Sequence, residues 1–325
     1  MKESRVASTG TKGRPIQRVL IVGAGTMGRG VAKSFAAGGF ETIVWSRRAP
    51  NVPELPEGVT AVPTPPVEPP DLVIENVPED FETKRAVYRA LEKVYPPSVI
   101  IATNTSGLPL DELAETLEHP ERFLGAHYLQ PAEVFPMVEV IAASATEPDV
   151  VERVAAAMRR TGKDPILVRK PVEGYLINRL QHAILHEAYH LIEIGAATAY
   201  EVDQVAKYLL GPRMCITGLI EQKDISGLEI HAKSQAAIVP KLAHTNTPTR
   251  FVQDMVARGA TGLRAGRGFY DWSGCDRSAV VEQASARFTR LLDFLARERR
   301  ATQAGTTPND RSAENVAESL RQRNR

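Results

Sequence analysis

The chain has 325 residues, of which 43% are apolar, and its formal net charge is +1. This composition predicts a globular protein with one large or two ordinary domains. The near-neutral charge gives no general electrostatic case for nucleic acid or a membrane surface as a partner. No secretory h-region or run of transmembrane length is present, and the only two cysteines, Cys215 and Cys275, lie far apart in the sequence. We therefore expect reduced thiols and a cytoplasmic location.

The first half of the chain alternates between patterns typical of strands and of helices. Apolar or β-rich runs predict strands at 19–22, 41–46, 59–62, 71–77, 98–105, 122–129, 137–143 and 165–170. Helical patterns follow the glycine turn at 23–28 and occupy 79–94, 110–117 and a segment that ends near Gly162, with a capping box at Thr146–Asp149. This alternation predicts an α/β fold, a doubly wound Rossmann-type domain.

The second half loses its strands after Pro171. Helical spacing runs over 173–194, and a capping box at Thr198–Glu201 predicts a further helix to about Leu210. We expect a disordered tail at 1–15, a dinucleotide-binding domain at 16–170, an all-helical substrate and dimerisation domain at 171–300, and a second tail at 301–325.

The turn between the first strand and the first helix reads GAGTMG, a G-x-G-x-x-G pattern over 23–28. Gly23 permits the tight turn, Gly25 lets the backbone approach a pyrophosphate, and Gly28 lets the helix pack closely on the strand. Free N–H groups at the helix N-terminus, including those near Thr26 and Met27, favour an anion. The context predicts binding of a dinucleotide cofactor.

The end of the second strand indicates which dinucleotide is bound. NAD-binding versions carry a carboxylate there for the ribose 2′-hydroxyl. This chain has Ser46, Arg47 and Arg48 instead, and guanidinium groups pair well with a 2′-phosphate. We expect NADP(H) as the cofactor, with NAD as the second choice.

A different motif lies in the predicted helix at 173–194, where His186, Glu187 and His190 form H-E-x-x-H, the pattern of zinc proteases. His182 extends this stripe at helical spacing. Three histidines on one straight helix cannot close a tetrahedron, because the outer two are about 12 Å apart by helix rise. We expect no metal site here, and interpret the stripe as helix surface or dimer packing.

Three stretches complete a larger pattern: ATNTSGLPL at 102–110, GAHYLQPAEVFPMVEVI at 125–141, and GYLINRL at 174–180. Together with the glycine turn they resemble the 3-hydroxyacyl-CoA dehydrogenase family, over about 17–272 and ending on GRGFYDW. The resemblance implies that His127 is the catalytic acid/base and that Glu139, 12 positions later, is its partner. Hydride transfer to a ketone needs a proton for the developing alkoxide, and histidine titrates near neutral pH.

The resemblance also assigns the supporting residues. Ser106 and Asn178 match residues that contact the substrate oxygen, while Glu79 and Lys84 match a pair that contacts the ribose region of the cofactor. Asn104 lies in the same motif as Ser106 and is a further candidate for cofactor binding. The resemblance further implies a homodimer that forms through the C-terminal helices.

Two departures from the family bear on the substrate. Gln130 stands where the family usually has asparagine, and the segment from Ser46 to Asp71 is short and rich in proline. Acyl-CoA members carry a long helical insertion in that segment, so CoA binding is in question. The sequence leaves a small β-hydroxy or β-keto acid, a carrier-bound acyl group or thioester, and a larger keto intermediate open.

These patterns predict an NADP(H)-dependent oxidoreductase that transfers hydride to or from C3 of a β-hydroxy/β-keto acid or acyl thioester. They leave two alternatives: a non-catalytic NADPH-binding sensor or structural protein, and a zinc hydrolase that uses the HEAYH helix.

Overall fold

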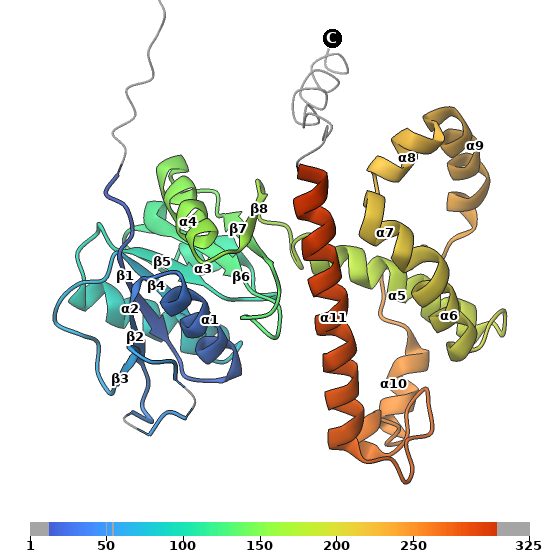
Figure 1. Ribbon diagram of the computed structural model, residues 1–325, viewed down its shortest axis with the longest axis horizontal. Coiled ribbons are helices and arrows are strands. Elements are labelled where there is room, and N and C mark those ends of the chain that lie inside the picture. Colours follow the sequence, from blue (N-terminus) through green and yellow to red (C-terminus); the bar gives the residue numbers. More distant parts are fainter. Residues whose placement is uncertain (1–12, 50, 54, 304–325) are drawn as a thin grey trace, which may run out of the picture. The chain divides into compact units, whose positions relative to one another are not determined.

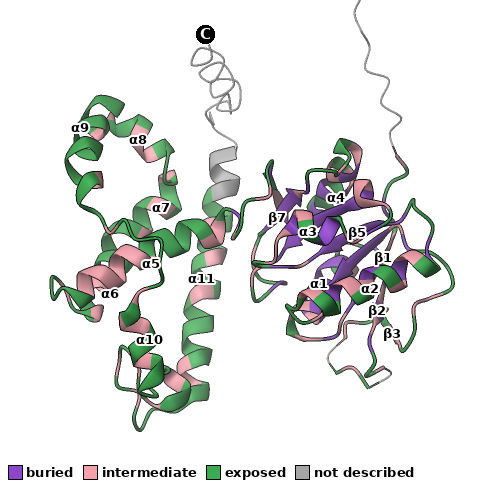
Figure 2. Cartoon of the chain, turned by 180° about the vertical axis from the view of Figure 1, so that it is seen from behind, coloured by how far each residue is buried: buried purple, intermediate pink, exposed green. Residues whose placement is uncertain are grey.

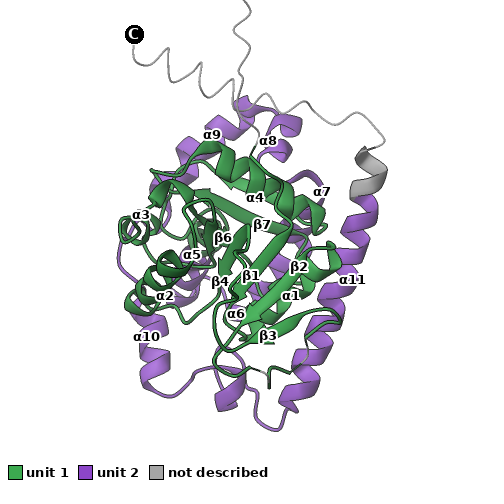
Figure 3. Ribbon diagram, turned by 90° about the vertical axis from the view of Figure 1, so that its left-hand side faces the viewer, with its two compact units in different colours: residues 1–184 green, residues 185–325 purple. Residues whose placement is uncertain are grey.

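The computed structural model describes residues 13–303 except 50 and 54. It divides the chain into two compact units, residues 1–184 and 185–325, shown in different colours in Figure 3. The boundary falls inside helix α5 (Ile177–Glu193). Within the described residues, no helix has the length and apolar character that a membrane crossing requires.

Unit 1 is built on an eight-stranded sheet with the order β3-β2-β1-β4-β5-β6-β7-β8 (Figure 1). The strands are β1 (Arg18–Val22), β2 (Glu41–Trp45), β3 (Thr60–Val62), β4 (Leu72–Glu75), β5 (Ile100–Thr103), β6 (Phe123–His127), β7 (Met137–Ala142) and β8 (Asp164–Val168). All neighbours pair in parallel except β6 and β7, which are antiparallel. The predicted doubly wound domain is confirmed, and the chain reverses direction between β6 and β7.

Helices cover both faces of this sheet because its strands are apolar on both sides. Alternate residues of β1 belong to two different core clusters. Val19 and Ile21 pack in the cluster that includes α1 (Thr26–Ala37) and α4 (Pro148–Arg160). Leu20 and Val22 belong to a second cluster with α2 (Phe81–Val94) and α3 (Leu110–Ala114). Figure 2 shows that the buried residues gather in the sheet and these helices. A short 3₁₀ turn, η1 (Pro120–Arg122), leads into β6.

Unit 2 is helical, as expected. After α5 it contains α6 (Ala199–Val205), a π-helical stretch η2 (Ala206–Leu210), α7 (Gly211–Thr217), α8 (Glu221–Ser226), α9 (Leu228–Ile238), η3 (Val239–Lys241), α10 (Arg250–Ala257), η4 (Leu263–Ala265) and α11 (Arg277–Gln303). The capping box at Thr198 and Glu201 is formed in full. None of the unit 2 residues with a described side chain is buried, so its helices are pink and green in Figure 2.

Three local expectations are corrected. Thr146 does not cap α4, because its hydroxyl donates to the carbonyl of Phe123 at 2.6 Å and Glu147 is the N-cap. The helix predicted from 173 begins at Ile177, since Gly174 and Tyr175 have positive φ angles. Helix α11 continues to Gln303, three residues into the tail predicted from 301. Residues 1–12 and 304–325 of the two predicted tails lie outside the described residues.

Candidate active site

The candidate site lies along the carboxyl ends of the central strands. Register pairs Val22 with Glu75 and Glu75 with Thr103, so β1, β4 and β5 end at one level. In open α/β sheets, ligands bind outside this edge, at the point where the strand order reverses. Here the order reverses between β1 and β4, beside the glycine turn.

The glycine turn has the shape that a dinucleotide needs. Gly23 has φ +99°, and a Cβ there would come within 2.7 Å of the Asn76 carbonyl oxygen. A Cβ on Gly28 would clash with the carbonyl oxygen of Gly23. By contrast, nothing lies within 4 Å of a Cβ built on Gly25, the N-cap of α1, and no side chain caps this helix. The space beside Gly25 and the free N–H groups at Thr26 and Met27 fit a pyrophosphate.

The end of β2 carries the residues expected to select the cofactor. Ser46 is buried, and its hydroxyl accepts a hydrogen bond from the Arg48 amide at 3.2 Å. Arg47 and Arg48 are exposed, and neither guanidinium is paired with a residue that the structure describes. No carboxylate follows β2 in the positions 46–48.

His127 and Glu139 face each other across the antiparallel β6–β7 pair, in register. The His127 Nδ1 and Glu139 Oε2 atoms are 2.7 Å apart, and both side chains are buried. Glu139 Oε1 accepts two more hydrogen bonds, from the amides of Leu176 at 2.9 Å and Ile177 at 3.1 Å. Burial raises the pKa of Glu139, but the hydrogen bonds from His127, Ile177 and Leu176 outweigh it, so the pKa lies below its ordinary value. An ionised Glu139 holds the Nδ1 proton and leaves Nε2 free for proton transfer.

Ser106 and Asn178 are also brought together. The Asn178 amide nitrogen donates to the Ser106 carbonyl oxygen at 3.2 Å. The Ser106 backbone and hydroxyl both donate to Glu79 Oε1, at 2.7 and 3.2 Å. The same oxygen accepts from the Thr105 hydroxyl and the Gly107 amide. Burial raises the pKa of Glu79, yet these bonds and the charge of Lys84 lower it overall. Glu79 is therefore an ionised anchor for residues 105–107, called the serine loop below.

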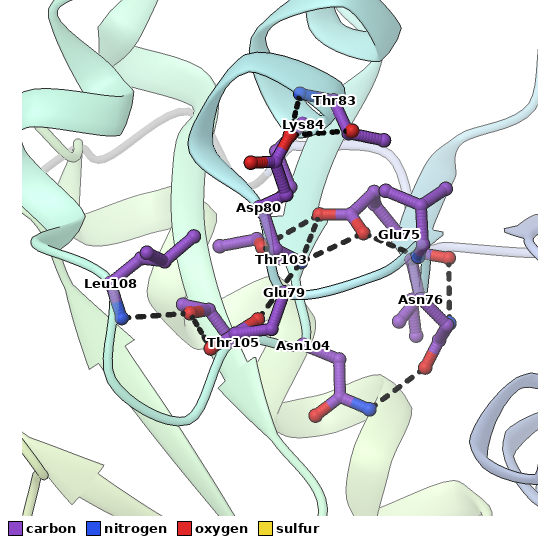
Figure 4. A network of polar contacts seen from close by, with 12 residues as sticks. Glu75, Asn76, Glu79, Asp80, Thr83, Lys84, Thr103, Asn104, Thr105 and Leu108 are labelled. Atoms are coloured by element: carbon purple, nitrogen blue, oxygen red, sulfur yellow. Dashed lines mark hydrogen bonds and ion pairs between the residues drawn. The ribbon is translucent and has the colours of Figure 1, made fainter.

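Lys84, expected to contact the cofactor ribose, has its ammonium placed between two carboxylates. Its side chain is fully buried, and its Nζ lies 2.9 Å from both oxygens of the buried Glu75 and 3.5 Å from Glu79 Oε2. The Tyr88 and Thr103 hydroxyls also donate to Glu75 Oε2, at 2.9 and 2.8 Å. Figure 4 shows Glu75, Lys84 and Thr103 of this network together with Glu79 and Thr105. In this structure the Lys84 ammonium forms a buried ion pair with Glu75. A buried charge needs an opposite charge as its partner.

Asn104 joins the same edge. Its side-chain nitrogen donates to Asn76 Oδ1 at 2.8 Å (Figure 4), and its oxygen accepts from the Tyr128 amide at 2.9 Å. Asn104 thus connects the ends of β4, β5 and β6 and fixes the backbone next to His127. Gln130 is exposed in the following loop, before a cis peptide bond to Pro131.

The HEAYH residues make structural contacts within unit 2. Glu187 accepts from the Ala243 amide at 2.8 Å, and His186 Nε2 lies 3.0 Å from the Thr245 hydroxyl. No group of three or more histidine, cysteine or acidic side chains in the described part of the chain is placed to hold a metal ion.

Three residues of this region were not singled out from the sequence. Glu75 and Asn76 end a strand in the DLVIENV stretch, where a carboxylate and an amide directly after three apolar residues are a usable signal. Tyr175, which packs on His127, has no such signal, because a positive φ at a tyrosine cannot be read from residue type.

The open glycine turn and the His–carboxylate pair at one sheet edge define a dinucleotide-dependent oxidoreductase. The chain matches the 3-hydroxyacyl-CoA dehydrogenase NAD binding domain over residues 66–171 and the C-terminal domain of the same family over 174–272. It is 29% identical to 5-formyl-3-hydroxy-2-methylpyridine 4-carboxylate 5-dehydrogenase of Mesorhizobium japonicum over 304 residues, 86% of this chain and 98% of that protein. It is 30% identical to L-carnitine dehydrogenase of Oceanobacillus iheyensis over 227 residues, 62% of this chain and 74% of that protein.

The fold is also similar to a solved structure. The crystal structure of a 5-formyl-3-hydroxy-2-methylpyridine 4-carboxylic acid 5-dehydrogenase, described as an NAD⁺-dependent dismutase, aligns with a TM-score of 0.79 and 27% identity, over 86% of this chain and 99% of that one. The chain belongs to the 3-hydroxyacyl-CoA dehydrogenase family and is a nicotinamide-dependent dehydrogenase.

Proposed function

We propose that the chain transfers hydride between a nicotinamide dinucleotide and C3 of a small β-hydroxy/β-keto acid, with His127 as the acid/base. The observation that carries this proposal is the buried contact between His127 Nδ1 and Glu139 Oε2 at 2.7 Å. A carboxylate on one ring nitrogen sets the tautomer and stabilises the imidazolium that forms when the other nitrogen takes the substrate proton. The bound nicotinamide supplies or accepts the hydride.

Ser106 and Asn178 serve the substrate oxygen in this proposal. Both carry N–H or O–H donors on adjacent segments, and Asn178 already contacts the Ser106 backbone. Such donors stabilise an oxygen that gains negative charge during reduction. Ser106 donates to Glu79 in this structure, so the serine would exchange this acceptor for the substrate oxygen, while Glu79 keeps the Ser106 and Gly107 amides.

The substrate is proposed to be a free acid and not a CoA thioester. Between β2 and β4 the described residues contain the short strand β3 and no helix. Two hydrogen bonds hold this segment in place. Trp45 Nε1 donates to the Pro63 carbonyl, and the Tyr95 hydroxyl donates to the Pro66 carbonyl. The segment therefore offers no helical insertion to hold CoA, and the printed names of the relatives from M. japonicum and O. iheyensis contain no CoA.

For the cofactor we propose a preference for NADP(H). The support is the pair of exposed guanidinium groups, Arg47 and Arg48, after β2 and the lack of a carboxylate at 46–48. The family domain and the structural relative are described with NAD, so the preference is testable against a clear alternative. Changing Arg47 to Asp should weaken NADPH binding at least about tenfold and leave NADH binding within twofold; tighter binding of NADH by the wild type would contradict the proposal.

We also propose a homodimer that forms through the helices of unit 2. Its exposed apolar side chains include Tyr208 at 69%, Ile220 at 73%, Ile225 at 68% and Ile230 at 68%. None of the unit 2 residues with a described side chain is buried, so these apolar side chains lack a covering partner within the unit, and a second copy is the usual partner. Light scattering should give about twice the chain mass of 35.5 kDa; a monomer at micromolar concentration would refute this.

The two exposed free cysteines suit a reducing, cytoplasmic location.

The deciding experiment combines binding and turnover. Purified protein is titrated with NADPH and NADH by nicotinamide fluorescence, its zinc content is measured, and a panel of 3-hydroxy and 3-keto acids is assayed free and CoA-linked. Turnover of a free acid that His127→Asn loses, with cofactor binding kept, would support the proposal. Cofactor binding without turnover of any acid would favour the sensor alternative, and one zinc per chain without cofactor binding would favour the hydrolase.

A further inference from the structure

A turn in front of helix α5 combines features that no role assigned above explains. Tyr175 is the only non-glycine residue with positive φ among the described residues, at +49°, and it follows Gly174 at +74°. A bulky side chain rarely takes this conformation, and such residues gather at functional sites. The Tyr175 hydroxyl is also buried without a hydrogen-bond partner among the described residues, which is uncommon in native proteins.

The left-handed turn determines where the next two amides point. The Tyr175 amide donates to the Val172 carbonyl at 2.9 Å, which closes the turn. The amides of Leu176 and Ile177 then both donate to Glu139 Oε1. Glu139 therefore occupies the N-terminal end of α5, where helix N–H groups and the dipole favour a negative charge.

The tyrosine ring reaches the other partner of the pair. Its centroid lies 5.4 Å from the centroid of the His127 ring, with 55° between the planes. His127 is thus bounded by Glu139 at Nδ1 and by the Tyr175 ring at one side of the imidazole. The turn therefore contacts both members of the pair: Glu139 through the Leu176 and Ile177 amides, and His127 through the Tyr175 ring.

From this geometry we infer that Tyr175 is a positioning residue for the His127–Glu139 pair. Its backbone turn directs two amides to Glu139, and its ring holds the imidazole in the orientation that bonds to this carboxylate. This role rests on the proposed function, in which the pair handles the substrate proton.

The hydroxyl adds a smaller contribution. Burial raises the pKa of Tyr175, and the charges of Glu79 and Glu139 raise it further, so the phenol stays protonated. The hydroxyl makes no hydrogen bond to a described residue. Removal of the oxygen alone should therefore have a modest effect on catalysis, and removal of the ring a large one.

Three variants separate these parts. Tyr175→Phe keeps the ring and removes the hydroxyl. Tyr175→Gly keeps a residue that accepts positive φ and removes the ring. Tyr95→Phe is the matched control, because it removes a hydroxyl that bonds to the Pro66 carbonyl at the end of α2. Circular dichroism and dinucleotide affinity establish that each variant is folded.

We expect kcat of Tyr175→Gly to fall about 100-fold and that of Tyr175→Phe by less than about tenfold, with dinucleotide affinity within twofold of wild type. The control should match the wild type. A Tyr175→Gly variant with near-normal kcat would overturn the inference, as would a Tyr175→Phe variant as slow as Tyr175→Gly. A fall in kcat that is matched by lost cofactor affinity would also overturn it.

A second readout needs no substrate. In the holoenzyme, a histidine Nδ1 proton bonded to a carboxylate gives a far-downfield proton resonance, and His127→Asn identifies it in histidine-labelled protein. Tyr175→Phe should keep this resonance and Tyr175→Gly should lose or broaden it; an unchanged resonance in Tyr175→Gly contradicts the inference. If the wild type turned over no acid, the proposed function would fail, while this resonance would still test the positioning role.

Discussion

Replacing Glu139 by glutamine tests the His127–Glu139 pair, because it exchanges one oxygen for an NH₂ group with little change of shape. One side-chain oxygen remains to accept the Leu176 and Ile177 amides, which lie 2.9 and 3.1 Å from Oε1. The new NH₂ group then faces His127 Nδ1, where Oε2 now lies at 2.7 Å. Because an amide nitrogen only donates, it forces Nδ1 to accept and moves the ring proton to Nε2. That tautomer cannot take the substrate proton.

The effect on rate should be large and that on stability small. General acid/base catalysis by a positioned side chain contributes about 10²–10⁴-fold, so kcat for alcohol oxidation should fall by about 10³-fold. The free energy of unfolding should fall by only about 1–2 kcal/mol, since the amide contacts survive and one charge-assisted hydrogen bond is weakened. Glu139→Ala is the contrasting variant, because it leaves two partly buried amides and the imidazole without their acceptor.

The measurement is steady-state oxidation followed by nicotinamide absorbance, with dinucleotide affinity from fluorescence and stability from urea unfolding. Lost turnover with unchanged affinity and a small change in unfolding free energy is the expected pattern. If Glu139→Gln kept kcat within threefold of wild type (about 0.65 kcal/mol), Glu139 would not set the tautomer, and the proton-transfer role of the pair would be wrong.

Further predictions concern stability and cofactor binding. Lys84→Met should lower the unfolding free energy by about 3–5 kcal/mol because it leaves the Glu75 carboxylate buried and unpaired, and adding Glu75→Gln should recover much of this in urea titrations. Gly25→Ala should keep the wild-type Tm, since its Cβ meets nothing within 4 Å, yet weaken dinucleotide binding at least about tenfold in fluorescence titrations. Gly28→Ala should lower Tm instead, because its Cβ clashes with a carbonyl. The pKa of Glu139 is lowered in the folded state, so the stability it contributes is present above the ordinary carboxylate pKa and lost as pH falls through the folded value; Glu139→Gln should show less acid destabilisation in pH-dependent unfolding.

The sequence predicts the strands and helices of unit 1 because each carries its own local signal. Val19 to Val22 form an apolar run before a glycine turn, and both sheet faces need apolar residues when helices cover them. The spacing of His127 and Glu139 indicates neighbouring strands, but a one-residue slip in register would turn the side chains to opposite faces. The structure supplies that register, with His127 directly opposite Glu139.

Local reasoning fails where a partner comes from a distant part of the chain. Thr146 has a capping-box pattern, but its hydroxyl is used by the Phe123 carbonyl of the neighbouring strand. At Tyr175, no residue preference indicates a left-handed backbone. The turn is held by a hydrogen bond from the next amide, that of Leu176, to Glu139, which lies 36 positions before Tyr175. Both cases are set by tertiary contacts that override local propensity.

Lys84 illustrates why a family resemblance does not fix a side chain's partner. Its position in the motif suggests a cofactor contact, but its ammonium is fully buried and lies between Glu75 and Glu79. A lysine that bound only a ribose would leave Glu75 as an unpaired buried carboxylate, which is far more costly than losing one exposed contact. The energetics therefore favour Lys84 as the link between the core carboxylate Glu75 and the anchor Glu79. Through Glu79, which accepts a hydrogen bond from the Ser106 amide at 2.7 Å, the charge of Lys84 acts on the serine loop.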